Sequence, residues 1–339
     1  MPVKTGCCGY RFYRPPEEVR KRYRDRLQAY VSQYELVELN STFYELPRPS
    51  TARRWRELAD EVKKEFEFIV KCNQRVTHPA TSPTYRKVRA KIPPEKAGEY
   101  GFFRPTEGVY EAWEETRRIC LELRARICLF QCPTSFRPTE ENLRNMETFF
   151  SSVERSGMTF AFEPRGAEWG PELVRDVCRR LELTHVVDPF KARPSHIHDV
   201  VYFRLHGLGR RPYAYKFRDE ELLKLRELCR EYETDWDVYV LWNNYEMYDD
   251  CRRFSMLVRG EELPKTPWGA EAVVEALDLE YPTTRDEIIE RFGRVWCWVE
   301  PDRRVRVGDV VGRLSQDTFR SREELLKALE EVIPRSGET

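Results

Sequence analysis

The chain has 339 residues with 58 acidic and 58 basic side chains, and its pI is near 7. This balance excludes the strongly basic class of nucleic-acid-binding proteins, so any site for a polyanion has to be local. We find no apolar segment of the length that a membrane span needs and no signal-peptide pattern, and therefore expect a soluble, cytoplasmic protein. Charged residues make up 34% of the chain, which fits a thermophilic source.

Eight short apolar runs alternate with helical patterns along the first 260 residues. Strands are predicted at residues 3–8, 36–39, 66–71, 126–132, 159–163, 184–188, 200–205 and 237–242. Helices are predicted over residues 17–32, 51–62, 109–123, 139–156, 171–181 and 246–257, with a further helix starting at Asp219 and Ser50 as an N-cap. This order predicts a single (β/α)8 barrel of the TIM type over residues 1–260.

A second, smaller unit follows a linker that is marked by Pro264, Pro267 and Gly269. Within residues 268–335 the sequence predicts a helix capped within residues 282–287, short strands at 295–299 and 304–307, and a last helix capped by Ser321. The predicted fold class of the whole chain is therefore α/β, a TIM-type barrel with a small C-terminal α+β appendage.

Polar residues close nearly every predicted barrel strand. They are Asn40, Thr42 and Tyr44 after the second strand, Lys71 at the third, Gln131 at the fourth, Glu163 and Arg165 at the fifth, Arg204 and His206 at the seventh, and Asn243 at the eighth. Active sites of parallel barrels lie at the C-terminal ends of the strands. These side chains are therefore predicted to line one cavity at the mouth of the barrel.

Four residues are candidates for moving protons. His206 is the first candidate for a general acid or base because an imidazole titrates near neutrality, and Glu163 is the second. Lys71 fits an anion-binding or Schiff-base amine, and His78, seven residues further on, fits an acid/base group or a metal ligand. Each has a structural alternative: a rim ion pair for Glu163 and Lys71, a backbone-bonded core histidine for His206, and a solvated or capping side chain for His78.

Arginines beside the strand ends predict that the site binds an anion. Arg165 and Arg204 lie on the strands themselves, and Arg210 lies in a glycine-containing loop after the seventh strand, where TIM barrels often hold phosphate. The substrate would be oriented by side chains of Asn40, Thr42, Tyr44, Gln131 and Asn243. For the asparagines, turn and helix-cap roles are the structural alternative.

The sequence predicts no organic cofactor and no metal cluster. The credible ligands are His78, His206, Glu163, Asp188 and Glu38. This set is too small for a trinuclear zinc site, although it leaves open a single divalent ion held by oxygen ligands. The ten cysteines form no Cys-x-x-Cys pair, and several lie in apolar runs, so we interpret them as small hydrophobic residues; disulfides stay open for a hyperthermophilic source.

Aromatic and basic residues are interleaved in two loops. The first set is Tyr85, Arg86, Lys87, Arg89, Lys91, Phe102, Phe103 and Arg104, and the second is Tyr213, Tyr215, Lys216, Phe217 and Arg218. Such a pattern suits stacking on nucleotides. The alternative is a lid that packs its own aromatic rings on the barrel, which we favour for Phe102 and Phe103.

Seven short motifs occur in a recognisable order. They are Gly6-Cys7-Cys8-Gly9-Tyr10, Glu38-Leu39-Asn40-Ser41-Thr42-Phe43-Tyr44, Lys71 with Thr77-His78, Phe130-Gln131-Cys132-Pro133, Glu163-Pro164-Arg165, Arg204-Leu205-His206-Gly207 and Trp242-Asn243-Asn244. Over about residues 3–258 the chain thereby resembles the YecE-like family, catalogued as domain of unknown function 72. The resemblance implies a TIM barrel, but no reaction, because the family has no established activity. Cys8 and Tyr10 stand where the family usually has Ser and Trp, and Gly166 stands where it usually has His.

The main functional hypothesis is an enzyme, a hydrolase, lyase or isomerase that uses acid/base and electrostatic catalysis on an anionic, phosphate-bearing or nucleotide-like substrate. The alternative is a non-catalytic protein that binds nucleic acid or a ribonucleoprotein. Convergence of His206, Glu163 and Lys71 in one closed pocket would favour the enzyme. Arginines and tyrosines spread over an open face would favour the binding protein.

Overall fold

The computed structural model describes residues 2–88, 92–211 and 213–333. The chain forms two compact units, one made of Met1–Leu205 with Glu227–Asn243 and the other of His206–Arg226 with Asn244–Thr339. The predicted domain limits, 1–260 and 268–335, stay a prediction.

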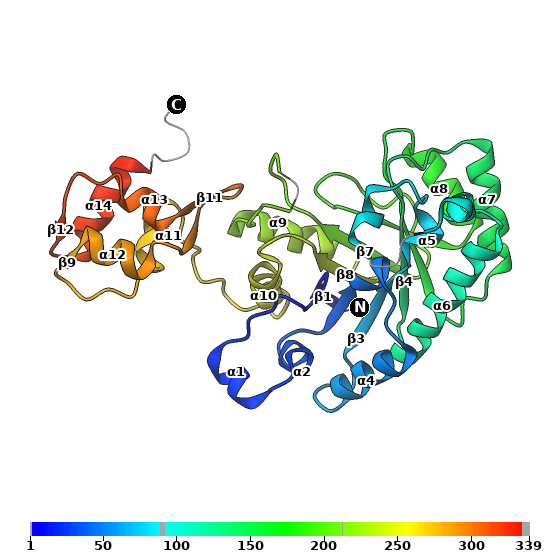
Figure 1. Cartoon of the computed structure of the whole chain (residues 1–339), viewed down its shortest axis with the longest axis horizontal. Helices are drawn as coiled ribbons and strands as arrows, with labels where there is room; N and C mark the ends of the chain where they lie inside the picture. Colours follow the sequence, from blue (N-terminus) through cyan, green and yellow to red (C-terminus); the bar gives the residue numbers. More distant parts are fainter. Residues whose placement is uncertain (1, 89–91, 212, 334–339) are drawn as a thin grey trace. The chain divides into compact units, whose positions relative to one another are not determined.

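The first unit contains a closed barrel of eight parallel strands in chain order, β1 to β8 (Figure 1). The strands are β1 Val3–Cys7, β2 Leu36–Leu39, β3 Glu67–Lys71, β4 Ile127–Gln131, β5 Thr159–Glu163, β6 Leu183–Val187, β7 Val200–Leu205 and β8 Asp237–Trp242. β1 pairs with both β2 and β8, which closes the barrel. The predicted TIM-type fold is confirmed, and all eight strands lie within a residue or two of their predicted positions.

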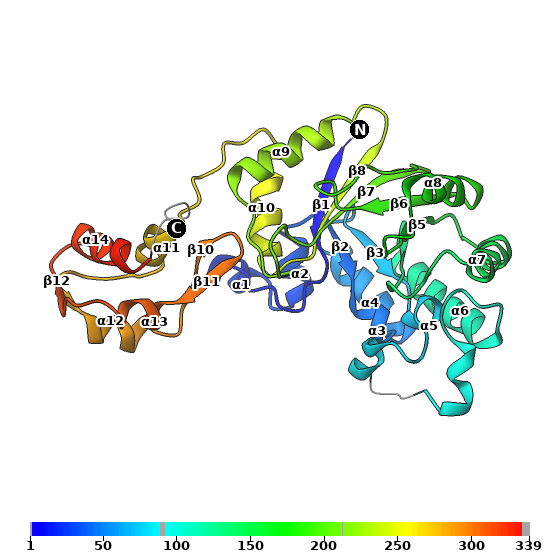
Figure 2. The ribbon, with the colours of Figure 1, turned by 90° about the horizontal axis from the view of Figure 1, so that it is seen from above.

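Helices follow most of the strands of this unit, although no described helix lies between β6 and β7. Helices α4, α6, α7 and α8 lie outside the barrel (Figure 2). The helices are α1 Glu17–Arg22, α2 Arg26–Val31, α3 Ser41–Tyr44, α4 Pro49–Asp60, α5 Gln74–Thr77, α6 Glu107–Leu123, α7 Glu140–Ser152 and α8 Pro171–Arg180. Two 3-10 segments, η1 Pro83–Lys87 and η2 Pro94–Glu99, lie in the long loop after β3, and α9 Asp219–Arg230 crosses the boundary between the units.

Two local predictions were wrong, each for an identifiable reason. The single helix predicted over 17–32 is two helices, because the Asp25 side chain accepts from the backbone N–H groups of Leu27 and Gln28 and so starts α2. Ser50 is not an N-cap, because Pro49 occupies the first helical position of α4. Residues 41–44, for which no element was predicted, form the one-turn helix α3 directly after β2.

Strand periodicity explains why the barrel interior changes from apolar to polar at its C-terminal end. Leu36, Ile69, Leu129, Ala161 and Tyr202 belong to one buried cluster that draws on every strand of the barrel or its end. Side chains two positions apart on a strand face the same side. The next inward residues are therefore Glu38, Lys71, Gln131, Glu163 and Arg204, which are all charged or polar.

The second unit contains α10 Met247–Val258 and a small α+β arrangement of residues 269–333. Its elements are α11 Gly269–Glu275, β9 Thr283–Thr284, α12 Arg285–Phe292, β10 Trp296–Glu300, β11 Arg303–Arg306, α13 Val307–Val311, β12 Thr318–Phe319 and α14 Arg322–Val332. β10 pairs with β11 and β9 with β12, both antiparallel. Thr284 and Glu287 form a capping box at α12, and Ser321 caps α14, as predicted.

All ten cysteines are buried free thiols. Among the described helices, none is both long and apolar enough to cross a membrane.

Candidate active site

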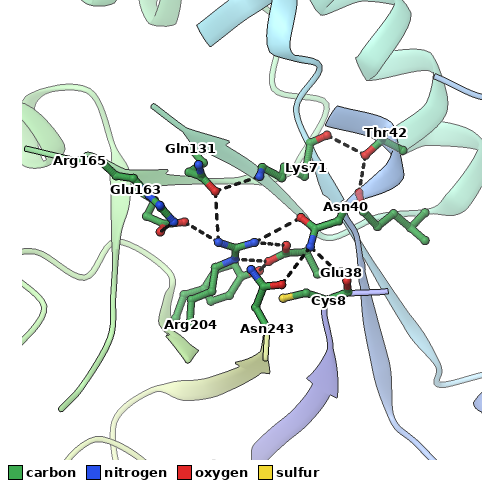
Figure 3. Close-up of polar contacts among 12 residues, drawn as sticks. Cys8, Glu38, Asn40, Thr42, Lys71, Gln131, Glu163, Arg165, Arg204 and Asn243 are labelled. Carbon is green, nitrogen blue, oxygen red and sulfur yellow. Dashed lines mark hydrogen bonds and ion pairs between the residues drawn. The ribbon is translucent and has the colours of Figure 1, made fainter. Parts of the chain in front are cut away.

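A buried ion pair lies at the centre of the polar end of the barrel (Figure 3). Arg204 Nη2 and Nε donate to the two carboxylate oxygens of Glu38 at 2.8 and 2.9 Å, and the Tyr202 hydroxyl donates to the same carboxylate at 2.6 Å. Burial alone would raise the pKa of Glu38, but the adjacent Arg204 guanidinium outweighs it and holds that pKa below its usual value. Glu38 and Arg204 are therefore both charged at neutral pH.

Arg204 also links the pair to neighbouring strands. Its Nη1 donates to Glu163 Oε2 at 3.0 Å and to Gln131 Oε1 at 3.2 Å, and its Nη2 donates to Asn40 Oδ1 at 3.3 Å. Together with Glu38, four side chains accept hydrogen bonds from this one guanidinium. They come from β2, β4 and β5 and from Asn40, directly after β2. The Arg204 side chain is thereby fixed in a single orientation.

Arg165 is the more accessible guanidinium of the site. Its Nη2 donates to Glu163 Oε1 at 3.0 Å, while a third of its side chain remains exposed. Glu163 thus lies between a fully buried arginine, Arg204, and a half-buried one.

Lys71 completes the set of charges. Its Nζ donates to Gln131 Oε1 at 2.9 Å and lies 4.2 Å from the centre of the Phe43 ring. Burial and the charge of Arg204 lower the pKa of Lys71 to about 7, although Glu38 and Glu163 act in the opposite direction. The amine therefore titrates close to neutral pH.

Side-chain amides lie around the charged groups. Asn40 Nδ2 donates to the Cys8 backbone carbonyl at 3.1 Å and to Asn243 Oδ1 at 3.4 Å. Asn40, Gln131 and Asn243 are half-buried, whereas Glu38 and Arg204 beneath them are fully buried. A molecule at the mouth of the barrel would meet these amides and Arg165 before it met Arg204.

Three other predicted site residues have structural contacts. Thr42 Oγ1 lies 2.6 Å from Leu39 O and 2.7 Å from Lys71 O, and so joins the ends of β2 and β3. Tyr44 is half-buried, with its ring edge-on to Phe43. His78 is 3% exposed, has its Nδ1 2.8 Å from Thr77 Oγ1 and packs against the Phe43 ring. Burial, Lys71 and Arg165 lower the pKa of His78 to about 3, so its imidazole is neutral at physiological pH.

His206 and Arg210 belong to the second unit. The His206 ring lies edge-on to Tyr213, at 5.6 Å between ring centres, and Arg210 is exposed. Of the twelve predicted site residues, hydrogen bonds between side chains join seven in the barrel: Asn40, Lys71, Gln131, Glu163, Arg165, Arg204 and Asn243. That these residues bind or transform a substrate stays a prediction.

The two loops rich in aromatic and basic residues differ in their packing. Phe103 is fully buried against Phe130, Phe136, Phe149 and Phe150, as expected of a segment packed on the barrel. Arg89 and Lys91 lie outside the described residues. In the second loop, Tyr215 and Phe217 are buried with their rings in contact, so they are not available to stack on a nucleotide.

The sequence did not predict that Tyr202 and Cys8 lie beside the Glu38 carboxylate at the centre of the site. Glu38 was considered as a metal ligand and as an ion-pair partner of Lys71, yet it is the bidentate partner of Arg204. Cys8 belongs, with Tyr202, to the buried apolar cluster of the barrel, and burial together with Glu38 raises the pKa of its thiol. The signal that could have found Glu38 and Tyr202 was strand periodicity, since each is two positions from another inward residue.

Among the residues that the structure describes, no three His, Cys, Asp or Glu side chains are grouped so that they could hold a metal ion. Asp188, one of the candidate metal ligands, forms an ion pair with Lys191 at 3.2 Å.

Gly166 has a φ of 118°, a conformation that residues with side chains rarely adopt. The backbone of the loop after β5 therefore favours glycine at this position.

A family model described as "Protein of unknown function DUF72" matches residues 4–271 of this chain. The chain belongs to the DUF72 family. A DUF72 protein from Thermotoga maritima is 24% identical to it, with a TM-score of 0.57, and the match covers 76% of this chain and 100% of that one. A DUF72 protein from Enterococcus faecalis is 17% identical, with a TM-score of 0.54 and coverage of 77% and 98%.

The C-terminal part matches a second model, "Family of unknown function (DUF5789)", over residues 269–337. Among curated proteins, none is significantly similar in sequence. The comparisons therefore establish the family and the fold of the barrel, and any reaction has to be inferred from the site itself.

Proposed function

We propose that the barrel is an enzyme that moves a proton on an anionic substrate, with Lys71 as the acid/base group. The observation that carries this proposal is the Lys71 amine itself, which is buried, oriented by Gln131 and surrounded by fixed charges. Its pKa of about 7 lets it accept and return a proton at neutral pH. Lysines on protein surfaces keep their proton under these conditions.

The surrounding residues suggest how a substrate would be held. Arg165, which is half-buried, would bind the anionic group, such as a phosphate or carboxylate. Arg204 already donates to Glu38, Glu163, Gln131 and Asn40, so in this proposal it is a positioning residue. Asn40, Gln131 and Asn243 would orient polar groups of the substrate at the mouth of the barrel.

The proposed step conserves charge and atoms. A proton leaves the substrate and its bonding electron pair stays there, while the neutral Lys71 amine becomes an ammonium. Glu38 and Glu163 stabilise that ammonium, and Arg165 stabilises the negative charge that develops on the substrate. Return of the proton to another atom completes an isomerisation, and loss of a leaving group completes a lysis. Both agree with the wider prediction of a hydrolase, lyase or isomerase.

The experiment that tests this proposal does not require the substrate to be known in advance. Full-length protein in deuterium oxide is incubated with pools of sugar phosphates, keto acids, hydroxy acids and nucleotides, and mass spectrometry records which compounds take up deuterium. We expect at least one anionic compound to exchange, with the rate lowered about 10²–10⁴-fold by Lys71→Met. Arg165→Ala should raise the concentration of the compound needed for half-maximal exchange.

A matched control separates catalysis from folding. Lys63 is half-buried and, like Lys71, has a lowered pKa, but its Nζ binds the Tyr34 carbonyl, so Lys63→Met should leave exchange unchanged. Lys71→Met should also raise the melting temperature, because it removes an amine whose charged form is disfavoured in the folded state. Full exchange by Lys71→Met would refute the proposal, and loss of exchange in His206→Ala alone would move the chemistry to His206.

A further inference from the structure

The two-stranded sheet of β10 and β11 has two chemically distinct faces. Its register pairs Trp296 with Arg306, Cys297 with Val305, and Trp298 with Arg304. Cys297 and Val305 face inward, where they join the apolar core of residues 270–333. Alternation along each strand therefore places the two tryptophans and the two arginines together on the outer face.

On the outer face, two guanidinium groups lie over indole rings. The Arg304 guanidinium carbon lies 4.7 Å from the centre of the Trp296 ring and 5.9 Å from that of Trp298, and the Arg306 carbon lies 4.9 Å from Trp296. Within the same unit, Arg304 also lies 5.6 Å from the Tyr245 ring. Trp298 is buried, but Trp296 is 47% exposed.

The N–H donors of both guanidinium groups remain accessible, since both arginine side chains are exposed. A guanidinium that lies over a ring uses its π face and keeps its N–H donors in its own plane. Among the described residues, neither Arg304 nor Arg306 forms an ion pair, whereas Arg303 beside them binds Glu300 at 3.0 Å.

The surrounding sequence is locally basic, although the chain as a whole is neutral. Residues 291–306 hold five arginines and two acidic residues, which gives 5 − 2 = +3. Proteins that bind single-stranded nucleic acid combine such local positive charge with exposed aromatic rings on which unstacked bases lie. The outer face of β10–β11 has both components at defined positions.

We propose that this face binds single-stranded nucleic acid, with a base stacked on the exposed part of Trp296 and neighbouring phosphates bound by Arg304 and Arg306. The proposal is independent of the reaction proposed for the barrel. Base stacking selects single strands, since bases in a duplex already stack on each other, and phosphate contacts make the affinity depend on salt.

Full-length protein is the material for the test. Fluorescence anisotropy would follow labelled 20-nucleotide oligo(dT) and oligo(U) at 50 and 200 mM salt, and tryptophan quenching would be recorded in parallel. We expect binding that weakens with salt, quenching that Trp296→Ala removes, and at least a tenfold lower affinity for the double variant Arg304→Ala, Arg306→Ala.

The control is the double variant Arg313→Ala, Arg320→Ala, which removes the same charge from two other exposed arginines of this part. Within residues 269–333, Arg320 follows β12, which lies at the end opposite β10–β11 (Figure 1). This control should bind nearly as tightly as the parent, and Lys71→Met should bind equally well. Circular dichroism and melting curves would establish that every variant is folded.

Three outcomes would overturn the proposal. The first is an equal loss of affinity in both double variants, which would indicate diffuse charge. The second is binding of duplex DNA as tightly as of single strands, which would exclude base stacking. The third is the absence of oligonucleotide binding, whether or not the same face binds anionic vesicles or acidic peptides.

Discussion

Two opposite charges of the barrel interior, Glu38 and Arg204, are less than 2% exposed. Removing two charges from water costs about as much as their attraction returns, so such a pair adds little to stability compared with apolar residues of the same size. Its effect is instead to fix positions. Arg204 holds Glu163 and Gln131, Gln131 holds Lys71, and the positive charge of Arg204 lowers the pKa of that lysine.

His78 provides a prediction about acid stability. Its pKa falls from about 6.5 in the unfolded chain to about 3 in the folded protein, so between these values the unfolded state binds more protons. Stability from this residue is complete above pH 6.5 and is lost as the pH falls toward 3, by up to about 1.4 kcal/mol per pH unit. His78→Gln should therefore flatten the fall in unfolding free energy over this range.

Urea unfolding of both proteins at pH 7, 6, 5 and 4 measures this difference. Acidic groups, including Glu38, also lose stabilising charge in acid, but they do so in both proteins and cancel in the comparison. Parallel curves for parent and variant would show that His78 is protonated in the folded state.

Among the secondary-structure elements, the barrel strands could be predicted from the sequence, but the short turn that follows β2 could not. The runs that form β2, β5, β7 and β8 were predicted to the residue, because a buried parallel strand is apolar throughout and ends where polarity begins. The one-turn helix α3 at Ser41–Tyr44 was not predicted. Such a turn is set by contacts with the neighbouring strand, which a local pattern does not contain.

Thr42 shows how one hydroxyl secures two elements. Its Oγ1 lies within hydrogen-bonding distance of the Leu39 and Lys71 carbonyls, at the ends of β2 and β3, and the residue is fully buried. Thr42→Val keeps the shape but leaves those carbonyls without this donor, so we expect a loss of about 1–3 kcal/mol in unfolding free energy. The same substitution at exposed Thr51 in α4 should change stability by less than about 0.5 kcal/mol. Equal effects at both positions in denaturant titrations would show that the hydroxyl of Thr42 is not structural.

For the whole molecule, the sequence was sufficient for the fold and for most members of the site, but not for how they pair. Polar strand ends predicted that Lys71, Gln131, Glu163 and Arg204 belong together. That Arg204 binds Glu38 depends on the distance across the barrel between β7 and β2, which strand order alone does not give. For the same reason the sequence did not predict that four protein side chains accept hydrogen bonds from Arg204, and its predicted contact with a substrate stays a prediction.

The ten cysteines give a prediction for the whole chain. Every one is buried as a free thiol, and burial raises the pKa of Cys178 to about 12 and of Cys297 to about 11. Because the thiolate is the reactive form, both access and ionisation oppose modification of the folded protein. We expect almost no reaction with Ellman's reagent within minutes at pH 8, and ten reactive thiols per chain in 6 M guanidinium without reductant. Fewer than ten thiols in the unfolded protein would reveal disulfides, and rapid reaction of the folded protein would show that part of this interior opens readily. Since these thiols lie in both units, the time course of labelling in moderate denaturant would also show whether the two units unfold together.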